Sequence, residues 1–191
     1  MKKASRIVFG ALMLWAQVTC VGAHELQSNR ATLVLRDDQH LTLSFFVDYT
    51  RVLHKVLAQQ QPLEAFVLTY AAMSPQAFQL QLLSAQRTLQ TRTVVVLHGG
   101  MSATLTQWVW PDAPTVQRLL QQQAMQALIA PADHAHLTQT EIRTETTAAN
   151  AMDFSAITLQ LPAEFEDVLV VSYQPKQVWA SPGQASSTIR F

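Results

Sequence analysis

The segment from Ala31 to Val47 reads ATLVLRDDQHLTLSFFV, two runs of β-forming residues on either side of a polar insert. The runs at Ala31–Leu35 and Leu41–Val47 favour strands, and the charged and polar residues between them are typical of a turn. The segment therefore predicts a β-hairpin. Similar runs recur later in the chain, which indicates a fold with several antiparallel strands.

Two short helices are expected directly after the hairpin. Apolar residues at positions 52, 53, 56 and 57 have helical spacing, and Asp48 or Thr50 can cap the helix that they form before Pro62. The apolar residues between Leu63 and Met73 suit a second short helix.

The centre of the chain combines an ambiguous segment with a second predicted hairpin. Between Phe78 and Leu89 the apolar residues alternate as in a strand, although neighbouring leucines also fit a helix; the alternation favours a strand. The runs at Thr91–Leu97 and Thr104–Trp110 are rich in β-formers and flank a Gly-Gly turn. They predict a hairpin.

A longer helix is expected between Pro111 and Pro131. Asp112 and Pro114 are typical of a helix start, and the apolar residues that follow form one stripe. The polar residues that alternate with the stripe are expected to face outward: Gln117, Arg118, Gln121 and Gln122.

The last third of the chain returns to strand patterns. The expected strands are a threonine-rich one exposed at a sheet edge (His136–Thr147), an alternating one (Ile157–Leu161), an apolar central one (Val168–Val171) and two more (Val178–Trp179, Ser187–Phe191). Because strands outnumber helices and hairpins recur, the expected fold class is α+β, with a mainly antiparallel β-sheet and a few short helices packed on one face.

The first 23 residues have the pattern of a secretory signal peptide. Three basic residues precede an apolar run from Ile7 to Ala16, and small residues occupy positions 21 and 23, before the cleavage point. The apolar run is shorter than the roughly 20 residues that a membrane-spanning helix needs. We expect cleavage after Ala23, which leaves residues 24–191 as a single soluble domain in the periplasm.

Composition excludes several classes of function. Three of the 13 basic residues and none of the 13 acidic residues precede the cleavage point, so the exported chain carries a net charge of −3. It has no basic cluster of the kind that binds nucleic acid. The one cysteine, Cys20, lies in the signal peptide, which excludes disulfides, thiolate metal sites and cysteine nucleophiles. Three glycines follow the cleavage point, too few for a phosphate-binding loop or a dinucleotide fingerprint.

Three histidines form a candidate metal site. An amino terminus at His24 offers an α-amine and an imidazole to one ion, and imidazole ligands suit Cu(II). His134 and His136 lie two residues apart, so that a strand places both on one face. The set resembles the amino-terminal histidine copper sites of periplasmic copper chaperones and lytic polysaccharide monooxygenases, and the resemblance implies copper as a cofactor. A solvated loop around the two downstream histidines is the alternative.

The run at residues 94–100, VVVLHGG, resembles the strand and His-Gly-Gly oxyanion loop of α/β-hydrolases. Ser102 is the nearest serine to His98, and Asp112 or Asp133 with His134 or His136 would complete a triad. The chain lacks the G-x-S-x-G elbow and the repeated βαβ units of that fold. A plain hairpin turn is therefore the favoured interpretation.

Two further groups have both a functional and a structural interpretation. Trp108 and Trp110 share one strand face, where they stack on a sugar ring or fill the core, and core packing is favoured. Glu164, Glu166 and Asp167 crowd a loop before an apolar strand, where paired acids can hydrolyse glycosides. A solvated turn explains these acids equally well.

Together these patterns predict an exported binding or accessory protein rather than an enzyme. Its expected partner is a protein or a small molecule, with no nucleic acid, no membrane span in the mature chain and no cofactor. The alternative is a periplasmic copper-binding protein that uses His24 with His134 or His136.

Overall fold

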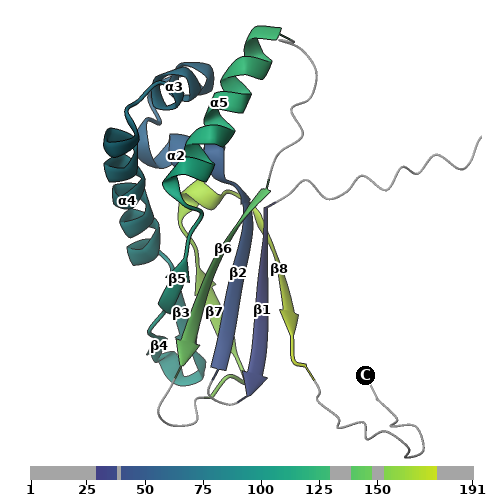
Figure 1. Cartoon of the computed structure of the whole chain (residues 1–191). Coiled ribbons are helices and arrows are strands. Elements are labelled where there is room, and N and C mark those ends of the chain that lie inside the picture. The colour runs from purple at the N-terminus through teal and green to yellow at the C-terminus, as the bar shows by residue number, and fades with distance from the viewer. Residues whose placement is uncertain (1–28, 38–39, 130–138, 148–152, 176–191) are drawn as a thin grey trace, which may run out of the picture.

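The computed structural model describes residues 29–37, 40–129, 139–147 and 153–175. Within these ranges the chain forms four α-helices and eight strands in two mostly antiparallel sheets, which confirms the α+β class. The helices are α2 (Tyr49–Leu57), α3 (Leu63–Ala71), α4 (Pro75–Arg92) and α5 (Ala113–Ile129). Figure 1 shows them gathered at one end of the sheets.

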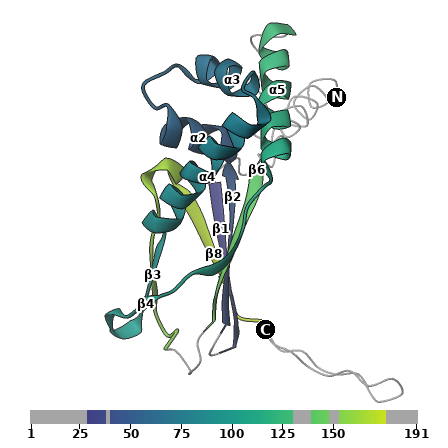
Figure 2. The same ribbon diagram turned by 60° about the vertical axis from the view of Figure 1, so that its left-hand side comes forward.

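The strands divide between a five-stranded sheet, in the order β5-β6-β2-β1-β8, and a three-stranded sheet, β4-β3-β7. Neighbouring strands are antiparallel except β1 and β8, which are parallel. Figure 2 shows β3 and β4 on one side, below the helices, and β1, β2, β6 and β8 on the other. The strands are β1 (Asn29–Asp37), β2 (His40–Asp48), β3 (Val94–Leu97), β4 (Ser102–Ala103), β5 (Thr106–Val109), β6 (Gln139–Thr147), β7 (Ile157–Gln160) and β8 (Val168–Tyr173).

The predicted first hairpin is confirmed as β1 and β2, in the middle of the larger sheet. Leu33 pairs with Leu43 and Ala31 with Phe45, and all four side chains are buried. We call this side of the five-stranded sheet its inner face. Because side chains alternate along a strand, the residues between them lie on the opposite, outer face.

The hydrophobic core lies between the inner face, the helices and the smaller sheet. Phe45 and Leu43 of the inner face belong to one cluster with buried side chains of the other elements. The largest contributions from the helices are Phe66 of α3, Phe78 of α4 and Leu120 of α5. One continuous core therefore joins both sheets and the helices.

Asp48 ends β2 and caps α2, as one of the two predicted capping residues. Its Oδ1 accepts a hydrogen bond from the backbone N–H of Arg51 at 3.2 Å, and its Oδ2 lies 3.2 Å from Arg51 Nε. Burial raises the pKa of the Asp48 carboxyl above its ordinary value of 3.8, and the contacts with Arg51 offset only part of this effect.

The predicted strand at Phe78–Leu89 is wrong, because this segment belongs to α4. Ser74 caps the helix by accepting a hydrogen bond from the backbone N–H of Ala77 at 3.3 Å, and Pro75 takes the first helical position. Leu82 and Leu89 then lie on the buried side with Phe78. The strand-like alternation is incidental, since Leu80 is 69% exposed.

Only half of the second predicted hairpin forms. β3 pairs with the two-residue strand β4 across a turn in which Gly99 and Gly100 have φ values of 80° and 84°. The segment expected as the partner of β3 contains β5, which pairs with β6 in the larger sheet instead. The chain therefore passes from one sheet to the other between β4 and β5.

The threonine-rich strand and the apolar strand take each other's expected places. β6, expected at an edge, lies between β5 and β2, where Ile142 and Thr144 are buried and the Thr144 hydroxyl donates to the Thr106 carbonyl at 2.8 Å. β8, expected at the centre of a sheet, is an edge strand of the described sheet. A threonine side chain tolerates burial here because its hydroxyl has a partner.

The predicted long helix is confirmed as α5, but Gln117 does not face outward. This residue is 8% exposed, and its Nε2 donates a hydrogen bond to the Met73 carbonyl at 2.8 Å. Gln121 donates in the same way to the Ala71 carbonyl at 3.3 Å. Both amides join α5 to the carboxyl end of α3, but Gln121 is exposed as predicted and only Gln117 is buried.

Several predicted features lie outside the described residues. They include the cleavage site after Ala23 and the strands at Val178–Trp179 and Ser187–Phe191. Of the helices that the structure describes, none combines the length and the apolar character that crossing a membrane requires.

The raised pKa of Asp48 predicts a pH-dependent difference between the wild type and Asp48→Asn. The folded state holds its proton to a higher pH than the unfolded state, so this carboxyl lowers stability as the pH rises from about 3.8 through the raised value. Asparagine caps helices as well but does not ionise. We expect Asp48→Asn to gain stability relative to the wild type between about pH 3 and 7, measured by urea denaturation.

Asp112→Asn is the matched control with the opposite sign. Hydrogen bonds from the backbone and side chain of Thr115 lower the pKa of the Asp112 carboxyl, so its ionised form stabilises the folded state above the unfolded pKa. This variant should lose stability relative to the wild type as the pH rises through the lowered pKa towards the ordinary value of 3.8, and the difference should then stay constant. A pH-independent difference for Asp48→Asn would contradict the burial of the Asp48 charge.

Candidate functional site

Side chains on the outer face of the five-stranded sheet form three rows that cross the strands. Residues paired between neighbouring strands share a face, so the pairing registers define each row. From β8 to β6 the rows are Leu169-Arg30-Phe46-Glu141, Val171-Thr32-Ser44-Arg143 and Tyr173-Val34-Thr42-Glu145. The half of the face next to β8 is thus apolar and hydroxylic with one cation, whereas the β6 half is charged.

A shallow groove with a volume of about 370 Å³ lies on the β8 half of this face. Side chains of β8 form one wall, side chains of β2 form the other, and β1 lies between them. The lining residues are Arg30, Thr32, Ser44, Phe46, Leu169, Val171 and Tyr173. None of these lining residues belongs to the hydrophobic core that the described residues form.

Arg30 places a positive charge at one end of the groove. Its guanidinium carbon lies 4.6 Å from the centre of the Phe46 ring, a cation–π contact that holds the side chain against the sheet. Among the described residues Arg30 forms no ion pair, and the nearest acid of its row, Glu141, lies beyond Phe46. No acid of the described residues therefore occupies the guanidinium donors, which can bind an anion.

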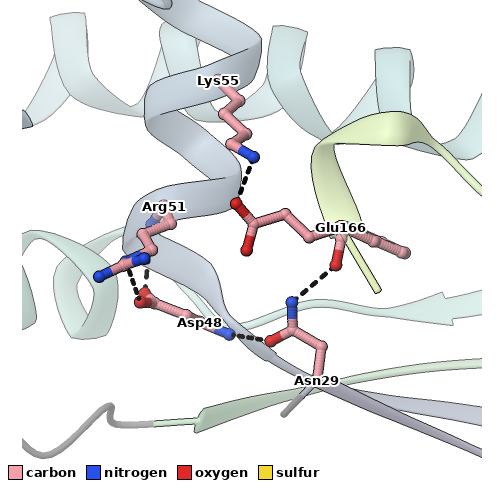
Figure 3. A network of polar contacts seen from close by, with 6 residues as sticks. Asn29, Asp48, Arg51, Lys55 and Glu166 are labelled. Atoms are coloured by element: carbon pink, nitrogen blue, oxygen red, sulfur yellow. Dashed lines mark hydrogen bonds and ion pairs between the residues drawn. The ribbon is translucent and has the colours of Figure 1, made fainter. Parts of the chain in front are cut away.

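The wall formed by β8 is held in place by the short helix η3 (Ala163–Phe165) directly before it. Phe165 is fully buried, and its ring centre lies 5.2 Å from that of Phe45. Its carbonyl accepts a hydrogen bond of 2.6 Å from Asn29 Nδ2, while Asn29 Oδ1 accepts one of 3.0 Å from the backbone N–H of Asp48. Figure 3 shows how this one amide ties together the ends of β1, β2 and η3.

The acids of this loop serve as links to the helices. Glu166 forms an ion pair with Lys55 of α2, which lowers the pKa of the Glu166 carboxyl, and Glu164 pairs with Arg92 of α4. Figure 3 shows the Lys55–Glu166 pair beside the Asn29 contacts. Glu166 also has a φ of 56°, a conformation that costs free energy for a residue with a side chain. The ion pairs of Glu164 and Glu166 match neither interpretation from the sequence, because these two acids join the loop to the helices and are not the acids of a solvated turn.

The other sequence candidates fall in separate places. His98 (η2, His98–Gly100) and Ser102 are both exposed, and no hydrogen bond joins them in the described structure. Asp112 caps α5, where its Oδ1 accepts a hydrogen bond from the Thr115 backbone at 2.6 Å. The described residues therefore do not assemble the hydrolase arrangement, and its other candidates, Asp133, His134 and His136, lie outside the described residues.

The tryptophan pair packs as the sequence favours. Trp108 and Trp110 are stacked with ring centres 5.3 Å apart, and both lie half-buried against the core. Trp110 also contacts Tyr49 at the start of α2, with ring centres 6.4 Å apart. These rings connect β5 to the helices.

The proposed copper ligands cannot be placed in the fold, because His24, His134 and His136 lie outside the described residues. Among the residues that the structure does describe, no group of three metal-binding side chains occurs. Copper binding at these histidines stays a prediction.

The groove residues were not among the sequence candidates, although two signals pointed to them. Phe46 is an aromatic residue at a position of the first hairpin that faces away from the core. The apolar run of β8 suggested burial on both faces, yet Leu169 and Tyr173 are 44% and 57% exposed. Only the strand order shows that these residues share a face with Arg30.

No protein-family model, no curated protein and no solved structure matches this chain. The groove is therefore interpreted from the charge, polarity and exposure of the side chains that line it.

Replacing Asn29 with alanine should destabilise the fold by about 1–3 kcal/mol, because the Asp48 N–H and the Phe165 carbonyl lose their partner at a partly buried position. Gln60→Ala removes an exposed amide and should change stability by less than about 0.5 kcal/mol. Chemical denaturation measures both. Equal effects of the two substitutions would show that the Asn29 amide does not tie the strands together.

The copper prediction is tested with Cu(II) alone, added to the chain that begins at His24. We expect tight one-to-one binding and a nitrogen-rich electron paramagnetic resonance signal, because the free α-amine and imidazole act together. The control carries one additional alanine before His24, which moves the α-amine away and should abolish the signal. Binding that is indifferent to the additional alanine would rule out this site.

Proposed function

We propose that this chain is an exported binding protein whose ligand is an elongated apolar molecule with an anionic end, such as a fatty acid. The observation that carries this proposal is the position of Arg30, a cation with no ion pair among the described residues, which lies on an aromatic ring at one end of a groove with apolar and hydroxyl side chains. The predicted signal peptide supports an exported role.

The shape of the groove supports an elongated ligand. Its wall on β8 runs from Leu169 to Tyr173, roughly 13 Å at about 3.3 Å per residue. Val171 in the middle of this wall is apolar and half-buried. An alkyl chain that lies along the groove covers these side chains and is removed from water, which favours binding.

The polar groups support an anionic end. Arg30 lies in the first row, so a carboxylate there can accept hydrogen bonds from its guanidinium. The other polar groups of the groove, the hydroxyls of Thr32, Ser44 and Tyr173, carry no charge. The two ends of the groove therefore differ in charge, which gives the ligand one orientation.

Isothermal titration with decanoate tests this function, with decyltrimethylammonium as the cationic counterpart of similar length. We expect the anion to bind and the cation not to bind. In Arg30→Gln the affinity for decanoate should fall about 10- to 100-fold, because a charge-assisted hydrogen bond contributes roughly 1.5–3 kcal/mol. Circular dichroism checks that the variant remains folded.

Arg143→Gln is the matched control, since it makes the same substitution on the same face but outside the groove, where Arg143 already pairs with Glu145. Its affinity should equal that of the wild type. Absence of decanoate binding, or an equal loss in both variants, would overturn the proposal. Vesicles of phosphatidylglycerol, added in a separate arm, show whether the anionic end belongs to a free acid or to a membrane lipid.

A further inference from the structure

The edge strand β8 lacks the features by which proteins protect sheet edges. Edge strands are usually short, bulged, charged or covered, because their free N–H and C=O groups pair with other strands. β8 has six residues, VLVVSY, with no charge and no proline. Its Leu169, Val170 and Tyr173 are 44%, 47% and 57% exposed. Within the described residues, no strand pairs with the edge of β8 that lies away from β1.

The other edges of the described sheets are protected. β4 has two residues and β7 has four, which leaves little backbone for pairing. β5 is irregular, with Gln107 at a φ of 51° and a shift of register between Thr106 and Val109. The contrast singles out β8 as the place where another strand can be added.

We propose that β8 pairs antiparallel with β8 of a second copy of this chain, about a two-fold axis at Val171. Two copies related by such an axis keep their outer faces on the same side of a continuous sheet. Two residues that lie directly opposite each other must then have their side chains on the same face of the sheet. An axis between two neighbouring residues would oppose an outer-face residue to an inner-face residue. The axis therefore passes through a residue. In a six-residue strand this leaves Val170 or Val171 as the central position.

The register at Val171 places the two most exposed outer-face side chains of β8 opposite each other. Leu169 lies across from Tyr173 of the second copy, and Val170 lies across from Ser172 of the second copy. Aromatic and aliphatic side chains that face each other across strands stabilise a sheet. With the axis at Val170, Tyr173 would instead face the charged Asp167 of the second copy.

The charge distribution favours a second copy over a different polypeptide. On a two-fold axis each charge faces its own copy, so a charged edge strand repels itself, whereas a strand with no charge does not. β8 carries none, and Arg30, the cation of the described residues that pairs with it in register, lies one strand further in. The edge therefore suits its own copy without any complementary charges from a foreign strand.

Pairing of this kind also adds to the groove. The second copy places its Tyr173 beside Leu169, in the same row as Arg30. The groove wall on β8 is then widened by an aromatic side chain from the other subunit. Pairing of β8 with its own copy depends on the edge strand and requires no ligand in the groove.

Disulfide cross-linking tests the register in the chain that begins at His24, which contains no cysteine of its own. Directly opposed residues of antiparallel strands have Cα atoms about 4.5–5.5 Å apart, within the range for a disulfide. Val171→Cys should therefore give a covalent dimer on mild oxidation. Val170→Cys should not, because its two copies are displaced by two residues.

Val109→Cys is the matched control, an exposed valine (61%) on the outer face at the opposite edge of the same sheet. It should remain monomeric on oxidation. A dimer of Val170→Cys but not of Val171→Cys would overturn the proposed register. Equal cross-linking of Val109→Cys and Val171→Cys would show random collision and overturn the proposal.

Sedimentation analysis without cross-linking provides the second measurement. Contacts of this small size are typically weak, so we expect a concentration-dependent dimer with a dissociation constant roughly in the micromolar range. Val170→Lys should shift the chain to monomer, because lysine protects edge strands, whereas Val109→Lys should not. A wild-type chain that stays monomeric at high concentration would overturn the inference and leave β8 to a foreign strand.

The dimer and the ligand are tested separately. All association measurements are made without decanoate, and Arg30→Gln should dimerise as the wild type does. Loss of decanoate binding with dimerisation retained would contradict the proposed function alone, and the reverse result would contradict this inference alone.

Discussion

The contact of Phe165 with Phe45, fixed by the Asn29 amide, is the interaction on which the architecture depends. Phe165 is buried between the sheet and α2, and one amide bridges its carbonyl to the backbone of Asp48. Because η3 is anchored there, the chain enters β8 at the end where β1 begins. β8 must then run parallel to β1, and the side of β8 that lies away from β1 becomes the edge of the sheet.

The two faces of the larger sheet differ because the hydrophobic core of the described residues lies against only the inner face. On the inner face, leucine and phenylalanine side chains of the hairpin meet the helices and the smaller sheet in one core. The outer face keeps apolar side chains near β8 and charged ones near β6. An apolar area that the fold leaves open, with a cation at its margin, is typical of a binding surface. The same strand supplies both the groove wall and the unprotected edge.

Local signals predicted most elements, because they act between residues close in sequence. The alternation of the first hairpin, the cap at Asp48 and the start of α5 at Asp112 were all visible in the sequence. The error at Phe78–Leu89 arose where the periods of strand and helix coincide over a few residues, and the Ser74-Pro75 start decided for the helix. The candidate site was predicted less well, since Arg30, Phe46 and Leu169 are far apart in sequence and meet only through strand pairing.

The sequence by itself determined the α+β class, the central hairpin and the long helix. The tertiary structure alone decided which strands are neighbours: β6 in the interior, β8 at the edge and β5 in the larger sheet. The physical reason is that alternation specifies which side of a strand faces the core but not which strand lies beside it. That choice depends on distant contacts, here the burial of Phe165 and the amide of Asn29, and it places a cation beside an apolar wall.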